Sequence, residues 1–246
     1  MRTLYLDCSC GVSGDMLLAA LLDAGNALEH LSGQLKRLDL DAFDLSVRTK
    51  LVAGVATRRV EVVQTREQPL RHLSDILAIV GRSSLSAELK AGACEVFGLL
   101  ARAEALVHAT TPEQVHFHEI GAVDTIVDVV GVLALVELYS PKRIKASAVN
   151  LGSGFVSMAH GTFPVPAPAV AELAKGLTTF ATDSGCELAT PTGMALLRHL
   201  VREFGPLPRG AITAVGYGSG SRSDDKNPTF LRAFLIDEQE TSVHAV

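Results

Sequence analysis

The segment from residue 116 to residue 139 constrains the fold of this 246-residue chain more than any other. Between Ala122 and Tyr139 its only charged residues are Asp124, Asp128 and Glu137. A helix that is apolar on nearly every face packs inside a protein, so this segment predicts a central, buried helix. Asp124 and Asp128 lie one turn apart on one face, where they repel each other unless something neutralises or hydrates them.

Candidate metal ligands lie immediately before this helix. Residues 115–119 are predicted to be extended, so His116 and His118 share one face and Glu119 points the other way. Imidazoles with nearby carboxylates are the ligand set of zinc, nickel, cobalt, manganese or iron. His160, beside a flexible glycine, is a further candidate ligand. Any one such residue is more often a paired polar group of a core, but the whole cluster favours a metal or catalytic site.

The composition limits the class of protein. Hydrophobic residues make up 48% of the chain and charged residues 20%, which is enough for a core and excludes global disorder. The net charge of −5 and the lack of a Lys/Arg run disfavour nucleic-acid binding. The longest apolar run, residues 129–136, is too short to span a membrane, and no secretory signal is recognisable. Four cysteines without a regular framework favour a reduced, cytoplasmic protein.

Strand-like and helix-like segments alternate along the chain and predict an α/β fold, with a mixed sheet and flanking helices. We expect one large domain over residues 1–246, with a disordered tail at 238–246. Strands are expected at residues 3–8, in a hairpin over 43–64, and at 143–151, 211–215 and 230–236. Helices are expected at residues 17–25, closed by Gly25, and at 27–38, 70–80, 87–108, 169–174 and 194–204.

The turn at residues 9–16 joins the first predicted strand to the first predicted helix. Free backbone N–H groups at such a helix N-terminus can bind an anion, which makes Ser13 and Gly14 candidates for contact with a phosphate or carboxylate. A plain tight turn capped by Ser13 explains the same residues equally well. Asp7 and Asp15 flank the turn and can orient a metal ion or a substrate cation.

A second glycine-containing segment, residues 216–228, lies between the last two predicted strands. Gly218 and Gly220 make the backbone permissive, and Arg222 adds a positive charge, so this segment is predicted to bind a phosphate or another acidic ligand. A mobile hairpin loop without a ligand is about as compatible with the pattern.

Five motifs recur together in one protein family. They are Asp7-Cys8 with Gly11 to Met16, His116 to Asp124, His160-Gly161 with Pro164 to Pro168, Glu187 with Thr190 to Gly193, and Gly216 to Gly220. In this order, over nearly the whole chain, they resemble the LarC family of nickel insertion proteins. Five linked motifs are far more specific than any one of them.

The resemblance implies insertion of nickel into pyridinium-3,5-bisthiocarboxylic acid mononucleotide, with formation of nickel–carbon and nickel–sulfur bonds. It also implies dependence on CTP hydrolysis with manganese or magnesium, and a product that serves as the nickel-pincer nucleotide cofactor of lactate racemase-type enzymes. The imidazole and carboxylate cluster can hold nickel, and the glycine turns can receive the nucleotide phosphate. A base is needed to remove the ring proton, and Asp124, Asp128 or a free histidine can supply it. Asp15 completes the set of candidate catalytic residues.

The sequence departs from the family pattern in two respects. Family members usually continue into a C-terminal domain that carries much of the CTP and metal binding, so we expect a fragment, or one half of a split protein with a separate partner chain. The histidine-rich insertion frequent in the family is absent. Two other functions remain open: a non-catalytic module that passes metal or substrate to a partner, and a metal-dependent hydrolase of a phosphorylated small molecule. The oligomeric state, including a homo-oligomer, is also open.

Overall fold

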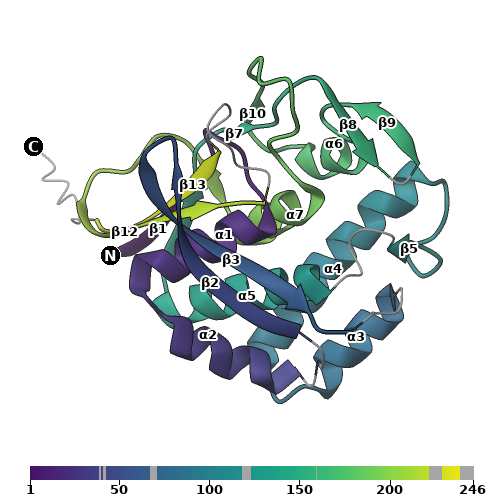
Figure 1. Ribbon diagram of the computed structural model, residues 1–246, viewed down its shortest axis with the longest axis horizontal. Helices are drawn as coiled ribbons and strands as arrows, with labels where there is room; N and C mark the ends of the chain where they lie inside the picture. Colours follow the sequence, from purple (N-terminus) through teal and green to yellow (C-terminus); the bar gives the residue numbers. More distant parts are fainter. Residues whose placement is uncertain are drawn as a thin grey trace, which may run out of the picture.

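The computed structural model describes residues 1–38, 40, 43–66, 71–117, 123–158, 160–221 and 229–238. Within them, one mixed sheet of seven strands forms the frame of the molecule (Figure 1). Its strands are β1 (Arg2–Asp7), β2 (Phe43–Val52), β3 (Val55–Gln64), β6 (Arg143–Ala146), β11 (Glu203–Phe204), β12 (Ala211–Ser219) and β13 (Phe230–Asp237). They lie in the order β11-β6-β1-β13-β12-β3-β2.

Three short ladders and seven α-helices complete the described fold. The ladders are β4 (Arg71–His72) with β5 (His116–Phe117), β7 (Val149–Asn150) with β10 (Thr179–Phe180), and β8 (Phe155–Met158) with β9 (Gly161–Pro164). The helices are α1 (Gly14–Gly25), α2 (Leu28–Leu35), α3 (Leu73–Arg82), α4 (Ala87–Val107), α5 (Val123–Tyr139), α6 (Pro168–Ala174) and α7 (Pro191–Leu200), with a 3₁₀ turn at Lys36–Leu38. The α/β fold with a mixed sheet and flanking helices is confirmed. The predicted tail lies almost wholly outside the described residues.

The first strand separates two layers of apolar residues. β1 runs parallel to β6 and antiparallel to β13. Leu4 and Leu6 are fully buried in the main core, on the helical side of the sheet. Tyr5 points to the opposite face because side chains alternate along a strand, and there it joins Phe234 in a small second cluster. The sheet therefore presents its main apolar face to the helices.

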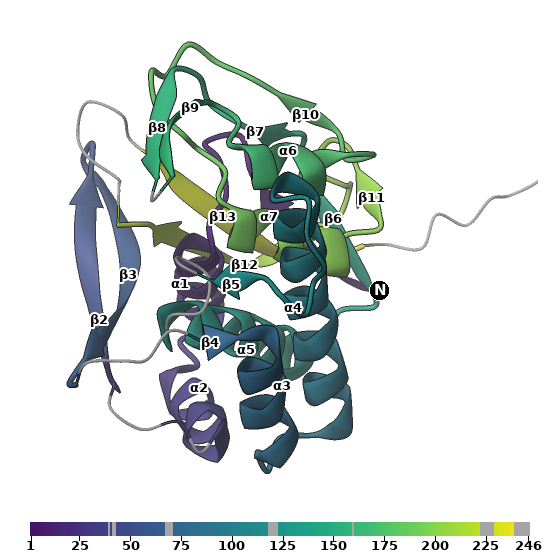
Figure 2. The same ribbon diagram turned by 90° about the vertical axis from the view of Figure 1, so that its right-hand side faces the viewer.

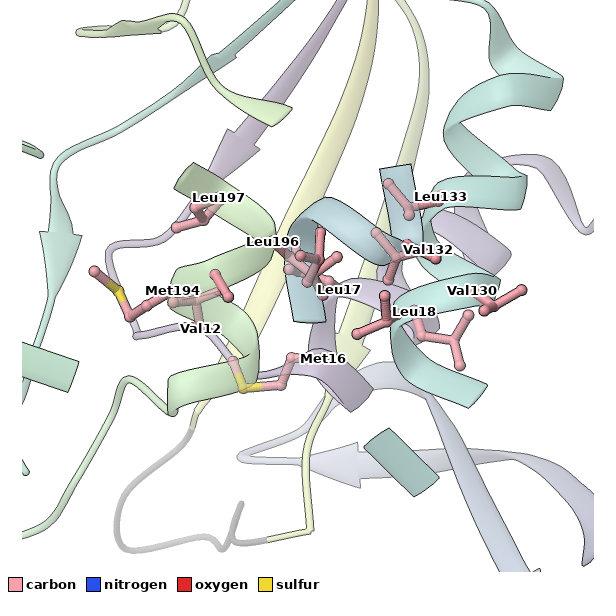
Figure 3. Packing of buried hydrophobic residues seen from close by; sticks show 14 of the residues in the cluster. Val12, Met16, Leu17, Leu18, Val130, Val132, Leu133, Met194, Leu196 and Leu197 are labelled. Carbon is pink, nitrogen blue, oxygen red and sulfur yellow. The ribbon is translucent and has the colours of Figure 1, made fainter. Parts of the chain in front are cut away.

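Helix α5 lies at the centre of the helical layer, as its sequence predicts. Most of its residues are buried, and it packs against α1, α2, α4 and β3. In Figure 3, Leu17 and Leu18 of α1 lie among side chains of α5 and α7. Gly131 permits this close packing, since a Cβ atom there would lie 2.7 Å from a methyl carbon of Leu18. The core thus fixes the relative positions of α1, α5 and α7.

The hairpin expected over residues 43–64 is confirmed. β2 and β3 pair antiparallel along their full length around the turn at Ala53-Gly54. Figure 2 shows this hairpin at one side of the molecule, and β3 packs against both α1 and α5. One strand of the hairpin therefore faces the same region as the N-terminal ends of those helices.

The predicted glycine-rich loop is wrong at its start, because β12 continues to Ser219. Gly216 and Gly218 lie inside this strand, where a Cβ atom on either would collide with the backbone of α1. The missing side chains let the strand lie directly on the helix. Residues 222–228, including Arg222, are outside the described part of the chain.

Several predicted boundaries also need correction. α1 includes Gly25, and its left-handed C-cap is Asn26 with φ of 47°. A Cβ atom on Gly25 would lie 2.5 Å from the Tyr139 hydroxyl, so close packing accounts for this glycine. The predicted strand over 143–151 divides into β6 and β7. The predicted helix over 194–204 begins at Pro191 and ends at Leu200. The one expected over 70–80 starts only at Leu73, after β4.

Candidate active site

A cavity of about 430 Å³ opens where the N-termini of three helices meet the edge of the sheet. The helices are α1, α5 and α7, and β3 and β8 provide further walls. The lining consists of residues 13–16, 59–62, 156–158, 187, 188, 190–192, 220, 221 and 229, with Asp124, Thr125 and Asp128. A cavity of this size is typical of small-molecule sites.

The two aspartates of α5 both line this cavity, as their helical spacing requires. Asp124 is exposed, and its Oδ1 atom accepts a hydrogen bond from the Thr125 N–H at 2.8 Å. Asp128 is half-buried one turn deeper, and no hydrogen bond or ion pair joins it to any described residue. The turn before α1 lies directly over it, since a Cβ atom on Gly14 would be 2.5 Å from Asp128 Oδ2.

The environment of the cavity raises the pKa of both carboxyl groups. For Asp128, loss of hydration raises the pKa well above its ordinary value, and the negative charges of Asp15 and Asp124 add to the shift. For Asp124, loss of hydration again raises the pKa, opposed by its backbone hydrogen bonds. A carboxylate with a raised pKa is a stronger proton acceptor, so the pair is suited to acid–base chemistry.

Asp15 is the third acid of the cavity and ties two of its walls together. Its side chain accepts hydrogen bonds from the N–H groups of Met16 and Ser221, each at 2.9 Å. The Ser13 hydroxyl donates a further bond to Asp15 Oδ1. Asp15 thereby fixes the turn before α1 against the residues that follow β12. All three predicted catalytic aspartates meet in one cavity.

The predicted cofactor-binding residues separate into two groups. Ser13 and Gly14 line the cavity, and Ser13 caps α1, accepting from the Met16 N–H at 3.4 Å. Gly220 also lines it. Gly218 instead packs against α1 inside β12, which provides a structural reason for this glycine. A phosphate contact for these residues stays a prediction.

The predicted metal ligands are only partly described. His116 belongs to β5, where its backbone pairs with His72 of β4. The side chain of His116, and His118 and Glu119 entirely, lie outside the described part of the structure. His160 is exposed and its ring contacts that of His108, with 5.0 Å between centroids. Among described residues, no group of three His, Cys, Asp or Glu side chains forms a metal site. The metal-ligand assignment stays a prediction.

Sequence reasoning missed one cavity residue of clear chemical interest. Arg59, on β3, is only 7% exposed, and its Nε atom donates to Glu61 Oε1 at 2.8 Å. Glu187, on the approach to α7, was noted only as part of a motif and also lines the cavity. The alternation of side chains along a strand could have predicted which residues share a face of the hairpin with Arg59. Only the packing of the hairpin against the helices shows that this face is enclosed.

Residues 4–246 match the family model described as nickel insertion protein. The chain belongs to the nickel insertion protein family. Four of the five motifs quoted for this family contribute residues to the cavity, namely those at 7–16, 116–124, 187–193 and 216–220. His160, the histidine of the motif at 160–168, is not among the described lining residues, and the side chains of His116 and His118 lie outside the described part of the chain.

Curated members of the nickel insertion family align with nearly the whole chain. The "Pyridinium-3,5-bisthiocarboxylic acid mononucleotide nickel insertion protein" of Desulfitobacterium hafniense is 46% identical over 232 residues, covering 94% of this chain and 58% of that protein. The protein of the same name from Staphylococcus epidermidis is 38% identical, covering 100% and 62%. A "Putative nickel insertion protein" of Desulfotalea psychrophila is 46% identical, covering 98% and 64%. This family member thus spans about three-fifths of these relatives' length.

No solved structure matches this family member. In the described ranges, none of its helices combines the length and the apolar character needed to cross a bilayer.

Proposed function

We propose that this chain binds pyridinium-3,5-bisthiocarboxylic acid mononucleotide in the cavity and removes a proton from its ring during nickel insertion. The observation that carries the proposal is the pair Asp124 and Asp128, which line the cavity with raised pKa values. The names of its relatives supply the substrate and the metal. Nickel is a substrate of this reaction and ends in the product.

The proposed step exchanges a ring proton for nickel. The C–H bond at the ring carbon between the two thiocarboxylate groups breaks, and its electron pair forms the nickel–carbon bond. The proton moves to one carboxylate of the Asp124–Asp128 pair, and the negative charge of the other strengthens that carboxylate's hold on it. The two thiocarboxylate sulfurs bind the same nickel ion. No oxidant or reductant is needed, because nickel enters as a dication and one proton leaves.

The nickel ligands in this proposal are His116, His118, Glu119 and His160. Three of them directly precede α5 in the sequence, five to eight residues before Asp124. This proximity in sequence favours delivery of the metal close to the proton acceptor. The CTP-dependent part of the reaction also needs manganese or magnesium. We assign it to the region of the relatives that this chain does not cover, or to a separate partner chain.

The proton-removal step can be tested without nickel or CTP. The substrate is incubated with the chain in D₂O, and exchange of the ring hydrogen is followed by mass spectrometry. The wild type is expected to catalyse exchange, and an Asp124→Asn/Asp128→Asn variant to lose about 10²- to 10³-fold of the rate, the usual contribution of a positioned base. Equal exchange in both proteins overturns the assignment of the base. Release of phosphate from the substrate favours the hydrolase alternative.

The nickel ligands are tested separately by calorimetric titration with nickel. Wild type is compared with a His116→Ala/His118→Ala variant whose fold is checked by circular dichroism. One tight nickel site in the wild type and none in the variant supports the ligand assignment. Equal binding, or no binding by either protein, places the metal on another chain or on residues elsewhere.

A further inference from the structure

We propose that Arg59 binds the phosphate group of the pyridinium mononucleotide. The inference rests on the proposed function and adds a binding residue to the same cavity. It starts from the guanidinium group of Arg59, which lines the cavity and has more than nine-tenths of its side-chain surface buried.

One hydrogen-bond donor of this guanidinium is unused. The Nε atom donates to Glu61, but the buried Nη1 atom has no hydrogen-bond partner among the residues that the structure describes. Buried N–H groups are nearly always paired, and an unmet donor on a charged group is destabilising. An unmet donor on a side chain that lines a cavity therefore indicates that a bound ligand supplies the acceptor.

The charges around Arg59 favour an anionic ligand. Glu61 is its ion-pair partner, but the same Glu61 Oε1 atom also accepts from Arg48 Nη2 at 2.8 Å. Hydrogen bonding by Arg59 lowers the pKa of Glu61, with Arg48 adding to the effect, so this carboxyl is ionised at neutral pH. Two arginines thus share one carboxylate, which leaves one net positive charge. A guanidinium with free donors is well suited to a phosphate group.

The positions of Asp124 and Asp128 indicate which end of the mononucleotide lies at Arg59. The reacting ring carbon must lie near Asp124 and Asp128, and the thiocarboxylates on either side of it take the nickel. Arg59 belongs to the β3 wall of the cavity, whereas both aspartates belong to the α5 wall. The phosphate is at the opposite end of the nucleotide from the reacting carbon. It therefore fits the β3 wall better than the α5 wall.

The helix N-termini agree with this division of the cavity. Asp15 and Asp124 lie in the first turns of α1 and α5, where they already offset the positive ends of those helices. The first turn of α7 contains no acid, and Thr190 caps it by accepting from the Gly193 N–H. The acids in the first turns of α1 and α5 therefore repel a phosphate dianion, which leaves Arg59 on β3 as the more favourable contact.

The test measures binding of two nickel-free probes by calorimetry, without CTP. The first is pyridinium-3-carboxylic acid mononucleotide and the second is the corresponding nucleoside, which lacks the phosphate. We expect wild type to prefer the mononucleotide. In Arg59→Gln, mononucleotide affinity should fall about 10- to 100-fold, as for loss of a charged hydrogen bond, and nucleoside affinity should stay unchanged. Arg59→Lys should be intermediate, because lysine keeps the charge and loses the fork of donors.

Arg58→Gln is the matched control. Arg58 is the adjacent residue of β3, pairs with Asp23 at 3.2 Å and does not line the cavity. The Arg58→Gln variant should bind both probes as the wild type does. The phosphate assignment is overturned if Arg59→Gln keeps the preference for the mononucleotide, or loses affinity for both probes equally. Failure of the wild type to bind either probe instead rejects the proposed function itself.

Discussion

Asp7 and Asp128 are carboxylates of the same kind in opposite electrostatic situations. Asp7 ends β1 and accepts hydrogen bonds from the Ser9 N–H at 3.1 Å, the Ser9 hydroxyl at 2.5 Å and Arg232 Nε at 3.0 Å. Asp128 faces the cavity from α5 and has no hydrogen-bond partner among the described residues. Asp7 is fully paired by neighbouring residues, whereas Asp128 is paired with none of the residues that the structure describes.

The pKa values of the two acids move in opposite directions for this reason. Burial acts to raise the pKa of Asp7, but hydrogen bonds from Ser9 and Arg232 and the charge of Arg232 outweigh it, so the net shift is downward. Burial also raises the pKa of Asp128, and there Asp15 and Asp124 add to it. Loss of water is common to both sites, so the partners decide the sign. A paired acid of this type stabilises the fold, whereas an unpaired one in a cavity is available for a ligand.

The largest expected effect is on the rate of ring-hydrogen exchange, which should depend on Asp128 and not on Asp7. Asp128→Asn should reduce ring-hydrogen exchange about 10²- to 10³-fold, because the proton acceptor or its charged neighbour is lost. Asp7→Asn should leave the rate per folded molecule unchanged, because Asp7 does not line the cavity. Exchange measured in D₂O at equal concentrations of folded protein gives both rates. A comparable loss in the Asp7 variant would falsify the contrast.

A smaller effect is expected on stability, and here the order of the two residues reverses. Asp7→Asn should lower the free energy of unfolding by about 1–2 kcal/mol, because charged hydrogen bonds are lost and the exposed side of Arg232 is hydrated again. Asp128→Asn should raise the free energy of unfolding at pH 7, since a neutral amide replaces a carboxyl group that is poorly hydrated and is repelled by Asp15 and Asp124. Urea denaturation followed by circular dichroism measures both changes. Destabilisation by Asp128→Asn would show that the carboxylate has a structural partner.

The sequence predicts the acids of the site well because they are exceptions within their surroundings. Charges are rare in the segment that forms α5, so Asp124 and Asp128 stand out, and helical spacing places both on one face. The strand, turn and helix around Ser13 are likewise a local pattern. These signals depend only on neighbours in the chain, and the structure brings their residues to a single cavity.

The misassigned residues depend on contacts between distant segments. Gly218 has the sequence context of a loop, but its missing side chain serves the close approach of β12 to α1. Arg59 is one of several charged residues in the β2–β3 hairpin, and nothing in its neighbours marks it as enclosed. Its burial follows from the packing of β3 against α1 and α5. Such placements are set by tertiary structure, so sequence patterns alone do not predict them.

The smallest and most specific effect is on the pH dependence of stability. Unfolding returns both pKa values toward about 3.8. Because the pKa of Asp7 is lower in the folded state, its stabilisation is present above pH 3.8 and is lost as the pH falls through the folded value. Because the pKa of Asp128 is higher in the folded state, its contribution is most favourable below pH 3.8 and is lost as the pH rises toward the folded value.

Urea denaturation of wild type, Asp7→Asn and Asp128→Asn between about pH 3 and pH 8 measures how the free energy of unfolding of each protein changes with pH. This range extends to both sides of the unfolded-state pKa of about 3.8. The deficit of the Asp7 variant should shrink toward the acidic end of the range. The advantage of the Asp128 variant should grow from the acidic end upward and level off above the folded pKa. If a divalent cation or the mononucleotide binds beside Asp128, that advantage should diminish or reverse when the ligand is added, because the ligand then supplies the missing partner. Parallel pH profiles for the two variants would mean that their carboxylates have equivalent surroundings, contrary to the contrast between them.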